Sequence, residues 1–497
     1  MKGGCDQEGG RDPIERALAQ LIGELEVQSC HGPREATVRH LCFDSRKARL
    51  DSLFVALPGK YCDGHAFLDD AFARGAAVAV GQNEHTPPAG KTYVRVPHSR
   101  RALSRLAAAF YGHPTRTLWT VGITGTKGKT SVAHYCQAVL DHARCLSTVT
   151  NAAAGLENTT PESLDIQRLA HEALLAGRRR LVLEVSAHGL VHQRVNDVAF
   201  DAAVFTNLSQ DHFDDFDGFD AYFQAKAQLF NTMQTPTAII NADDAFGKKL
   251  IQQTPQRLLS YGLKPQAQVY ATALRLRQNG SRFKVHTPTG VFVLNARQPG
   301  RFGVYNLLAA VAVGVCAGVP LERIKTGLES VKRVPGRFEQ LDTPQGVRVV
   351  VDFAHSPDSL AKMLGFLKEH YAKVVAVFGC GGESDPYKRP IMGRISGQLA
   401  DYTVITHDNP KREDPQQILS QIESGVRQQT ARYDVIADRA TAIRHALSRA
   451  RPGDCVLVAG KGHETEQIFG QQHLPFNDRQ FLMDACGALP VADDQET

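Results

Sequence analysis

The stretch TVGITGTKGKTSVAHYCQAVL, residues 120–140, joins an apolar run to a glycine-rich turn and then to a helical pattern. Glycines let backbone N–H groups point at phosphate oxygens, and the following helix adds its positive N-terminal end. The general expression GxxxxGK[ST] requires glycine at position 123, where this chain has Ile123. The order of strand, loop and helix nevertheless predicts an ATP site rather than a purely structural glycine turn.

The roles of the loop residues follow from their chemistry. Lys129 is expected to neutralise the charge of the β- and γ-phosphates, and the Thr130 hydroxyl is expected to ligate Mg²⁺. The predicted loop contacts to ATP are Gly125, Thr126, Lys127, Gly128, Lys129, Thr130 and Ser131.

Composition excludes several other classes of protein. The 497 residues are 42% hydrophobic and 22% charged with a net charge of +5, which is typical of a globular protein of about three domains. The chain has no long Lys/Arg block, so we expect no nucleic-acid partner. Its ten cysteines lack CxxC or zinc spacing and favour a reducing compartment, the cytoplasm. The N-terminal residues have no apolar core, so we expect no secretory signal, and the apolar stretch 307–321 is shorter than a membrane span needs, so we expect no membrane insertion.

Alternating strand and helix patterns predict an α/β protein of three domains. Residues 1–117 form a small α/β domain, residues 118–335 a P-loop-type domain with a parallel sheet, and residues 336–497 a Rossmann-like doubly wound domain. The stretch VPGRF, residues 334–338, is the expected linker. In the third domain, the strands in VRVVVDFAH, KVVAVFGCGG, DYTVITHDNP and DCVLVAGKGHE each end in a polar or glycine-rich turn, where ligands of such sheets bind.

Three residues outside the loop suggest a cation site. Glu184 closes the strand RLVLEV, His212 follows the strand AAVFTN, and Lys226 lies in the helical pattern AYFQAKAQLF. A carboxylate and an imidazole at strand ends can hold a divalent cation. Simpler interpretations remain open at this stage, with Asp211 and His212 capping a helix and Lys226 lying on a solvated face.

The motifs GTxGKT, EVSAHGL, TNLSQDH, AKAQLF and NADD resemble those of the Mur ligase family, and the resemblance covers nearly the whole chain. The N-terminal DSRKARLDSLFVALPG is similar to the family's UDP-recognition domain. The C-terminal HDNPKREDP and AGKGHETEQ are similar to its amino-acid-binding domain. The family's loop carries an aliphatic residue where the general expression has glycine, so Ile123 is ordinary in this context.

The resemblance implies an ATP-dependent, ADP-forming ligase of peptidoglycan precursor synthesis. Such an enzyme adds meso-diaminopimelate to UDP-N-acetylmuramoyl-L-alanyl-D-glutamate through an acyl phosphate, with ATP and Mg²⁺ as cofactors, and is expected to be a monomer. Alternatives are L-lysine or ornithine as the amino acid, or a different acyl donor in a specialised pathway. A non-catalytic nucleotide-binding scaffold would be expected to lack one of the residues predicted to be catalytic, and all of these are present.

The resemblance also implies specific site residues. The predicted catalytic residues are Lys129, Glu184, His212 and Lys226, and the predicted Mg²⁺ ligands are Thr130, Glu184, His212 and Lys226 as its carbamate. Further ATP contacts are Asn306 on the adenine side, and Arg337, Asp352 and His355. The UDP-substrate contacts are Ser45, Lys60, Thr159, Thr160, Ser186, His192 and Arg194. The amino-acid contacts are Arg389, Asp408, Asn409, Lys411, Gly460 and Glu464. Ser45 could instead only cap a turn, and Arg194 could instead be a surface charge.

Four residues depart from the family pattern near these ligands. Lys127 stands where the family usually has asparagine, and His192 stands where it commonly has glutamine. Ser384 replaces the arginine of the family motif GGxRD. Lys411 gives this chain the motif DNPK, where the diaminopimelate-adding members have DNPR. Lysine offers a carboxylate a point charge where arginine offers a planar fork. Glu464 is expected to meet the distal ammonium of the amino acid, and Lys411 its distal carboxylate. An L-lysine substrate would place like charges together at Lys411, so charge favours diaminopimelate.

Overall fold

The structure is a computed structural model that describes residues 14–59, 62–156, 158–209, 216, 218–231, 233, 235–254 and 256–491. Lys60, Asp211 and His212 lie outside the described residues. The chain divides into two compact units. The first contains residues 1–122, 141–201 and 228–236, and the second contains residues 123–140, 202–227 and 237–497. Strand β8 (Trp119–Thr124) and helix α8 (Gly218–Asn231) each have residues in both units.

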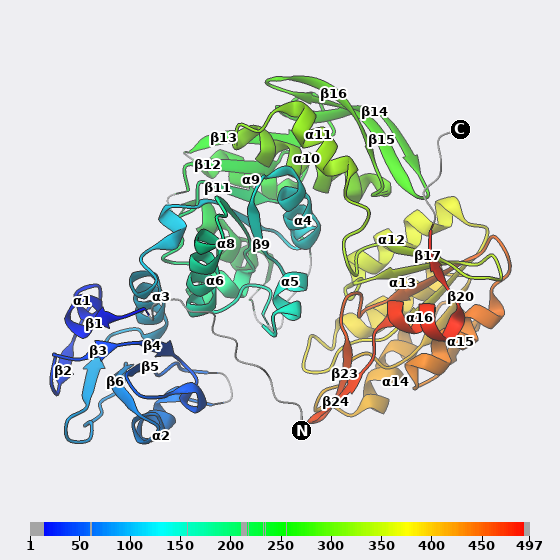
Figure 1. Ribbon diagram of the computed structural model, residues 1–497. Helices are drawn as coiled ribbons and strands as arrows, with labels where there is room; N and C mark the ends of the chain where they lie inside the picture. The colour runs from blue at the N-terminus through cyan, green and yellow to red at the C-terminus, as the bar shows by residue number, and fades with distance from the viewer. Residues whose placement is uncertain are drawn as a thin grey trace. The chain divides into compact units, whose positions relative to one another are not determined.

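The first unit contains a five-stranded sheet in the order β2-β7-β6-β5-β4 (Figure 1). Neighbours from β4 to β7 pair in parallel, and β2 joins β7 antiparallel. The sequence AAVAVG of β6 is nearly all buried, as expected for a strand covered on both faces. The strands of this region are β1 (Arg16–Ala17), β2 (Ser29–His31), β3 (Thr37–Val38), β4 (His40–Cys42), β5 (Ser52–Val55), β6 (Ala76–Gly81) and β7 (Thr92–Arg95).

Helices of this unit lie where the apolar patterns predict them. Helix α2 (Leu68–Ala73) ends just before Gly75, which has φ +113°, and the predicted strand RLVLEV is confirmed as β10 (Arg180–Glu184). β10 pairs in parallel with β9 (Ala143–Leu146), and α6 (Ser163–Leu175) packs against α3 (Ser99–Phe110). The remaining helices are α1 (Leu18–Gly23), α5 (Thr148–Ala153), α7 (Ala187–Val191) and the 3₁₀ turns η1 (Ser45–Lys47), η2 (Gly64–Phe67) and η3 (Pro114–Arg116).

In the second unit, β11 (Ala202–Phe205), β12 (Thr237–Asn241), β13 (Arg257–Gly262) and β14 (Val269–Arg277) pair in parallel in that order. The predicted parallel sheet is confirmed for these strands, and beyond β14 the sheet continues with antiparallel pairing. Strands β15 (Gly280–Thr287) and β16 (Gly290–Ala296) add an antiparallel meander, drawn as long neighbouring strands in Figure 1. Buried and more exposed residues alternate along β16, which is the pattern of a sheet with one face in solvent. The helices of this region are α4 (Lys129–Val139), α9 (Ala245–Gln253), α10 (Gly300–Cys316) and α11 (Leu321–Glu329).

The C-terminal part of the second unit is a seven-stranded sheet in the order β21-β20-β19-β22-β18-β17-β25. The predicted strands are confirmed as β18 (Arg348–Asp352), β19 (Val374–Phe378), β20 (Tyr402–Ile405) and β22 (Cys455–Ala459), which are parallel, as is β21 (Tyr433–Val435). β17 (Glu339–Asp342) and β25 (Leu489–Pro490) add an antiparallel edge. β23 (Glu466–Phe469) and β24 (Gln472–Pro475) form a separate hairpin.

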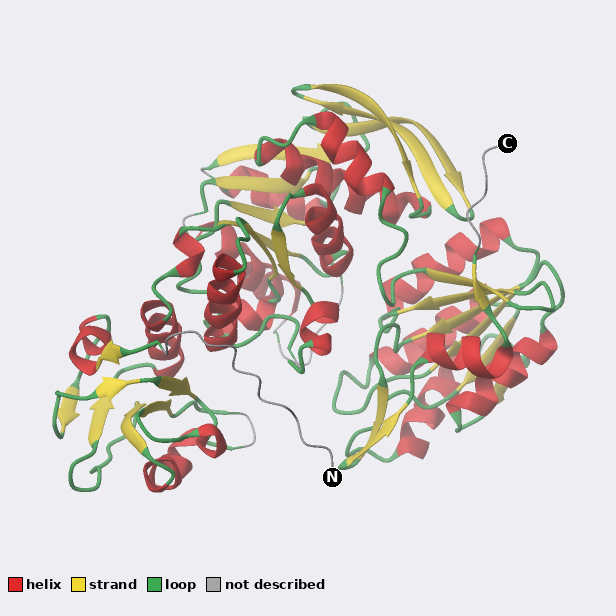
Figure 2. Ribbon diagram, viewed as in Figure 1, coloured by secondary structure: helices red, strands yellow, loops and turns green. Residues whose placement is uncertain are grey.

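Side-chain alternation along these strands builds two cores. In β19, Val374, Ala376 and Phe378 pack on one face with α12 (Pro357–His370), α13 (Lys388–Leu399) and α14 (Pro415–Arg427). Val375 and Val377 pack on the other face with α15 (Arg439–Arg449) and α16 (Asp478–Cys486). Helices therefore cover both faces of this sheet (Figure 2), which is the predicted doubly wound arrangement.

The order of the strands places a topological switch point between β19 and β22. The chain leaves β19 through α13 on one face and leaves β22 toward α16 on the other. Crevices at the carboxyl ends of strands on either side of such a point are where open α/β sheets bind ligands. The turns that begin at Gly379 and Gly460 lie at this point.

Candidate functional site

The glycines of the predicted phosphate loop have backbone conformations that other residues avoid. Gly125 has φ +138° and Gly128 has φ +87°. A Cβ on Gly125 would lie 1.9 Å from Thr206 Oγ1, and a Cβ on Gly128 would lie 2.3 Å from Asn306 Oδ1. The loop therefore closes tightly on the end of β11 and on α10, and Asn306 directly adjoins it.

Two residues after β11 hold the loop in this shape. The Thr126 N–H donates to Asn207 O at 2.8 Å, and the Lys127 N–H donates to Asn207 Oδ1 at 3.0 Å. The Lys127 carbonyl accepts from Thr206 Oγ1 at 2.7 Å and from Asn207 Nδ2 at 3.0 Å. The sequence interpretation used TNLSQDH only for His212 and missed Thr206 and Asn207. Their signal was the position of two polar residues directly after a buried strand.

Lys129 and Lys226 converge on one carbonyl oxygen. Lys129 Nζ donates to Gly125 O at 3.0 Å and to Thr126 O at 2.9 Å, and Lys226 Nζ donates to Gly125 O at 2.9 Å. Lys226 is 1% exposed, so the alternative of a solvated helix residue is wrong. Two ammonium groups on one acceptor repel each other, which favours an anion, or a change in the charge of one lysine, at this position.

Arg337 connects the linker stretch to the start of α4. Its Nη2 donates to Thr130 Oγ1 at 3.1 Å, and its guanidinium lies 4.4 Å from the centre of the Phe353 ring. Thr130 and Ser131 are buried in the first turn of α4. Arg337 is thus next to the predicted nucleotide loop, as its assignment to ATP requires.

Asp352 ends β18 and is partly buried in the vicinity of two cations. Its Oδ2 accepts from the Phe338 N–H at 2.7 Å. Burial raises the pKa of Asp352 to about 6, while the charges of Arg337 and Lys127 act to lower it. His355 lies three residues further on, with Nδ1 at 2.7 Å from Phe353 O. Lys127, which departs from the family pattern, therefore acts electrostatically on another predicted ATP contact.

Glu184 offers a buried oxygen to a ligand. One carboxylate oxygen, Oε2, accepts from the Thr148 N–H at 2.6 Å and from Thr148 Oγ1 at 2.7 Å. The other, Oε1, is buried and has no hydrogen-bond partner in the part of the chain that the structure describes. A buried carboxylate oxygen requires a donor or a cation, so the geometry fits a ligand at Oε1. Sequence reasoning missed Thr148, which no motif marks.

The predicted metal cluster cannot be completed from the described residues alone. Among these residues, no group of three or more His, Cys, Asp and Glu side chains could hold a metal ion. The prediction for His212 falls outside them and stays a prediction.

The predicted peptide-binding residues form one network in the first unit. Thr160 Oγ1 donates to Glu184 O at 3.0 Å and accepts from the Ser186 N–H at 2.8 Å. Arg194 Nη1 donates to Thr160 O at 3.0 Å, and Arg194 Nε lies 2.8 Å from Glu162 Oε1. The Arg194 side chain is only 10% exposed, so the alternative of a surface charge is wrong. Sequence reasoning missed Glu162.

The other predicted UDP-substrate residues that the structure describes are Thr159, His192 and Ser45. Thr159 Oγ1 accepts from Thr148 Oγ1 at 3.3 Å, and the His192 ring stacks on His188 at 6.2 Å. Ser45 is buried at the start of η1, but Asp44 caps this turn by accepting from the Arg46 N–H at 3.0 Å. The turn-cap interpretation of Ser45 is therefore wrong.

Three strand ends meet where the amino-acid site is predicted. A Cβ on Gly379, after β19, would lie 2.2 Å from Thr406 O, and one on Gly460, after β22, would lie 2.4 Å from Asp408 Oδ2. Asp408 therefore packs against the backbone of a strand that is not its neighbour in the sheet. Within the described part of the chain, the Asp408 carboxylate has no hydrogen-bond or ion-pair partner, although the residue is 7% exposed.

Lys461 pairs with Glu464, the residue that was expected to pair with the distal ammonium of the substrate. It is completely buried, and its Nζ donates to Asn409 Oδ1 at 3.0 Å, Glu464 Oε2 at 2.9 Å and Glu466 O at 2.6 Å. Burial and the charge of Asp408 raise the pKa of Glu464, while Lys461 and Asn409 lower it. Sequence reasoning missed Lys461, although it lies between the predicted Gly460 and Glu464.

Arg389 and Lys411 supply positive charge to the same region. Arg389 is 1% exposed and pairs with Glu413 at 2.7 Å and Gln421 at 2.8 Å, but its Nε has no hydrogen-bond partner among the described residues. Lys411 is half-buried, and its N–H donates to Ile468 O at 2.9 Å. Within the described residues its ammonium has no hydrogen-bond or ion-pair partner.

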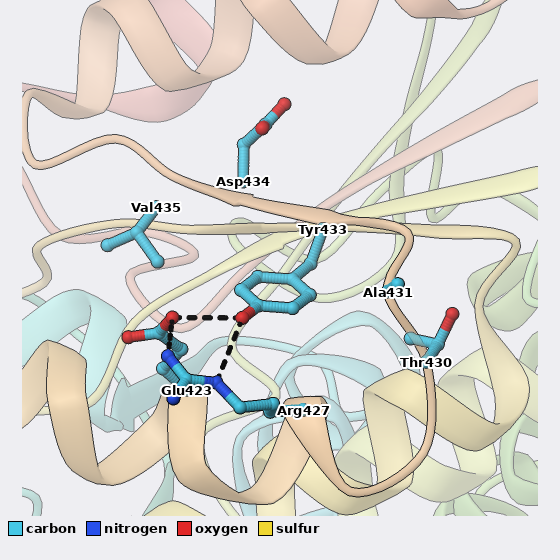
Figure 3. Close-up of a pocket in the computed structure, with 7 residues that line it drawn as sticks. All are labelled: Glu423, Arg427, Thr430, Ala431, Tyr433, Asp434 and Val435. Carbon is cyan, nitrogen blue, oxygen red and sulfur yellow. Dashed lines mark hydrogen bonds and ion pairs between the residues drawn. The ribbon is translucent and has the colours of Figure 1, made fainter.

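A cavity of about 580 Å³ lies elsewhere, at the end of α14 and at β21 (Figure 3). Glu423, Arg427 and Tyr433 line it and satisfy one another, with Arg427 Nη2 at 2.7 Å and Tyr433 Oη at 2.9 Å from Glu423 Oε1. None of the predicted site residues lines this cavity. Its polar groups are already paired, so we assign no function to it.

Three domain models of one protein family match successive parts of the chain. Residues 37–111 match the profile of the Mur ligase family, catalytic domain, residues 123–314 match the Mur ligase middle domain, and residues 336–462 match the Mur ligase, glutamate ligase domain. Among the described residues, we find no helix with the length and apolar character that a membrane span needs.

Individual relatives match over almost their full lengths. The UDP-N-acetylmuramoyl-L-alanyl-D-glutamate–2,6-diaminopimelate ligase of Caldanaerobacter subterraneus is 38% identical, covering 91% of this chain and 95% of that protein. The protein of the same name from Thermosynechococcus vestitus is 42% identical, covering 90% and 93%. A solved structure of a ligase with this name superposes with a TM-score of 0.63 at 28% identity, covering 95% of this chain and 99% of the other.

Gly128→Ala tests the nucleotide loop. Alanine at φ +87° costs about 1–2 kcal/mol, and its Cβ would meet Asn306 Oδ1 at 2.3 Å, so we expect the Kd for ATP to rise by about tenfold or more. Titration calorimetry measures this Kd. Gly177→Ala is the matched control, because Gly177 has φ +72° but nothing within 4 Å of its Cβ position. Equal Kd values for the two variants would contradict the assignment.

Asp352→Asn tests the partly buried carboxyl of Asp352. Asparagine still accepts from the Phe338 N–H but cannot ionise. The folded protein raises the pKa of Asp352 to about 6 from about 3.9 in the unfolded chain, so it binds the proton more tightly. The wild type should therefore lose free energy of unfolding relative to the variant as the pH rises from about 4 to about 6, with a constant difference above about 7. Urea unfolding across this pH range measures the difference in free energy of unfolding between the two proteins. A difference that does not change with pH would contradict the prediction.

Proposed function

The chain belongs to the Mur ligase family, and from this premise we propose that it is an ATP-dependent ligase that joins an amino acid to UDP-N-acetylmuramoyl-L-alanyl-D-glutamate. The proposed amino acid is meso-diaminopimelate, and the proposed coproducts are ADP and phosphate. One observation carries the proposal: relatives named for this reaction are 38% and 42% identical over nine tenths of the chain. We further propose that the protein acts in the cytoplasm as a monomer, on small-molecule substrates.

The reaction requires an activated carboxylate. A carboxylate is a poor electrophile at neutral pH, so transfer of the γ-phosphoryl group first makes an acyl phosphate, which the amine then attacks. Catalysis of phosphoryl transfer consists mainly of positioning and of neutralising charge. The tight loop between Gly125 and Gly128, with Asn306 beside it and Lys129 at its end, supports a role in holding ATP.

The oxygen ligands present are compatible with Mg²⁺, which prefers hard oxygen donors. Each unit by itself offers such a donor: in the first unit Glu184 Oε1 is buried without a partner among the described residues, and in the second unit Thr130, proposed to bind a different Mg²⁺, carries a hydroxyl at the start of α4. Bound Mg²⁺ would supply positive charge to the phosphoryl group and the acyl carboxylate. His212 is proposed as a further ligand on its motif alone.

Lys226 is proposed to carry a carbamate. Its buried ammonium shares the Gly125 carbonyl with Lys129, which is an unfavourable arrangement for two cations. Carbamylation would replace one positive charge by a negative one and provide oxygens for a cation.

The acyl donor is proposed to bind near Thr160, Ser186 and Arg194. Glu162 is the carboxylate partner of Arg194 at 2.8 Å and of Arg100 at 3.6 Å. Two guanidinium groups share this one carboxylate, so the cluster retains a net positive charge. Such a charge suits the carboxylates of an alanyl-glutamate peptide.

The amino-acid site is proposed to recognise a zwitterionic distal end. Lys461 already neutralises Glu464, and Glu413 neutralises Arg389. The charges that remain without partners among the described residues are the Asp408 carboxylate and the Lys411 ammonium. They complement an ammonium and a carboxylate respectively, which diaminopimelate carries on its distal carbon. We therefore assign the distal ammonium to Asp408 rather than to Glu464.

L-lysine or ornithine is the second candidate for the amino acid. Two substitutions favour it, because Lys411 grips a carboxylate less firmly than arginine and Ser384 contributes no positive charge. A different acyl donor is the remaining alternative, for which His192 is the relevant departure.

A substrate panel tests the function. The purified chain, UDP-N-acetylmuramoyl-L-alanyl-D-glutamate, ATP and Mg²⁺ are combined with meso-diaminopimelate, L-lysine or L-ornithine, and phosphate release and product mass are measured. We expect turnover with diaminopimelate to exceed that with L-lysine by about tenfold or more, since only diaminopimelate satisfies both open charges. Absence of product with all three amino acids would reject the proposed substrates.

Lys411→Met tests the recognition of the distal carboxylate. Methionine has a similar length but no charge, so the KM for diaminopimelate should rise by about tenfold, the value of one charge-assisted hydrogen bond, while the KM for ATP stays unchanged. Arg412→Met is the matched control, since the Arg412 side chain is adjacent, basic and 71% exposed. Equal effects of the two substitutions would show that Lys411 contributes only general positive charge.

A further inference from the structure

Arg439 and Asp478 form a completely buried ion pair outside every motif discussed above. Arg439 Nε lies 2.7 Å from Asp478 Oδ1, and Arg439 Nη2 lies 2.8 Å from Asp478 Oδ2. Both side chains have no exposed surface. Removing two charges from water carries a large desolvation cost, so such a pair is weak evidence for a stabilising role.

Both residues begin a helix, but the helix favours the charge of one and disfavours the charge of the other. Asp478 is the first residue of α16, where the positive end of the helix favours an anion. Arg439 is the first residue of α15, where the same effect disfavours a cation. Helix formation therefore does not explain an arginine at position 439.

The remaining contacts of Arg439 explain it better. Nη1 donates to His407 O at 3.3 Å, and Nη2 donates to Ala459 O at 3.0 Å. His407 directly precedes Asp408, and Ala459 directly precedes Gly460. Arg439 thus contacts the backbone immediately before two predicted amino-acid-binding residues.

The sheet itself does not join these two loops. β20, which leads to His407, and β22, which ends at Ala459, lie on opposite sides of β19. Asp408 Oδ2 would be 2.4 Å from a Cβ on Gly460, so the distance between the loops is closely constrained. Arg439 spans the carboxyl end of β19 and provides hydrogen bonds to both loops from one planar group.

We propose that Arg439, held by Asp478, is a positioning residue that sets the separation of the Asp408 and Gly460 loops and thereby the binding of the incoming amino acid. The identity of the ligand rests on the proposed function, whereas the positioning of the loops does not. Lysine cannot replace Arg439 in this role, because its point charge cannot reach the carboxylate and both carbonyls together.

The charge of Arg439 also acts on the site. Burial lowers the pKa of Arg439, but the carboxylates of Asp478, Asp408 and Glu464 together hold it above its usual value. The guanidinium therefore remains charged and partly offsets the two carboxylates nearest the site.

Arg439→Lys is the first test, with Ile443→Ala as the matched control. Ile443 is completely buried on the same helix, so its truncation destabilises the core of α15 and removes no contact of Arg439 to the loops. The first readout is hydrogen exchange of the backbone amides in residues 406–411 and 459–468. We expect faster exchange in both segments for Arg439→Lys and in neither for Ile443→Ala.

The second readout is the split between kinetic constants. A loop displaced by about 1 Å can cost up to about 100-fold, so we expect the KM for the amino acid to rise by about tenfold or more in Arg439→Lys. The KM values for ATP and for the UDP-substrate should equal those of Ile443→Ala. Equal increases in all three KM values, or unchanged exchange in both segments, would overturn the proposal.

The double variant Arg439→Met/Asp478→Leu covers the case in which a lone buried charge prevents folding. Replacing a buried ion pair by apolar side chains is often neutral or stabilising, and it still removes the hydrogen bonds to both loops. We expect the same faster exchange and the same selective rise in KM. A stable double variant with wild-type exchange and KM would overturn the proposal.

Failure of this proposal can be told apart from failure of the proposed function. Wild-type protein that turns over none of the panel amino acids would reject the function, and the exchange experiment would still decide the role of Arg439. Turnover by the wild type with unchanged exchange in Arg439→Lys would reject only the positioning role.

Discussion

Close approach of the backbone at the ends of parallel strands is the constraint on which both proposed sites depend. Thr206, after β11, packs directly against Gly125, and Asp408, after β20, packs directly against Gly460. A Cβ at either glycine would lie within 2.4 Å of a side-chain oxygen atom, so that side chain would have to move. The absence of a side chain at these points lets polar groups from different strands converge, and the chemistry assigned to each site requires this convergence.

Buried cations follow from the same geometry. The converging strand ends present carbonyl oxygens, and Lys129, Lys226 and Arg439 each donate to at least one of them. Lys461 donates instead to the carbonyl of Glu466 at the start of β23. Backbone carbonyls carry partial negative charge and hold an ammonium or guanidinium group that would otherwise be costly to bury. These cations then determine how much charge remains for a ligand. At the amino-acid site, Lys461 leaves Asp408 as the open carboxylate.

The sequence allowed much of the fold to be predicted, since buried strands such as VVAVF in β19 and the phosphate loop are local patterns. The antiparallel β15 and β16 were not predicted, because the βαβ rhythm of this region indicates only parallel strands. Among site residues, those in long motifs were placed by resemblance. Thr148, Glu162, Thr206 and Arg439 were missed, because each acts through a contact with a residue distant in sequence.

By itself, the sequence determined the alternation of strands and helices, the glycine-rich loop and the resemblance to a family, because all three are read from short segments. Only the tertiary structure decided which charges are paired. In the structure, Lys461 forms an ion pair with Glu464, Glu413 with Arg389, and Glu162 with Arg194. The side chains of Asp408 and Lys411 have no ion-pair partner among the described residues. The physical reason is that the strength of an ion pair depends on distance and burial, which arise only when segments far apart in the chain are packed together.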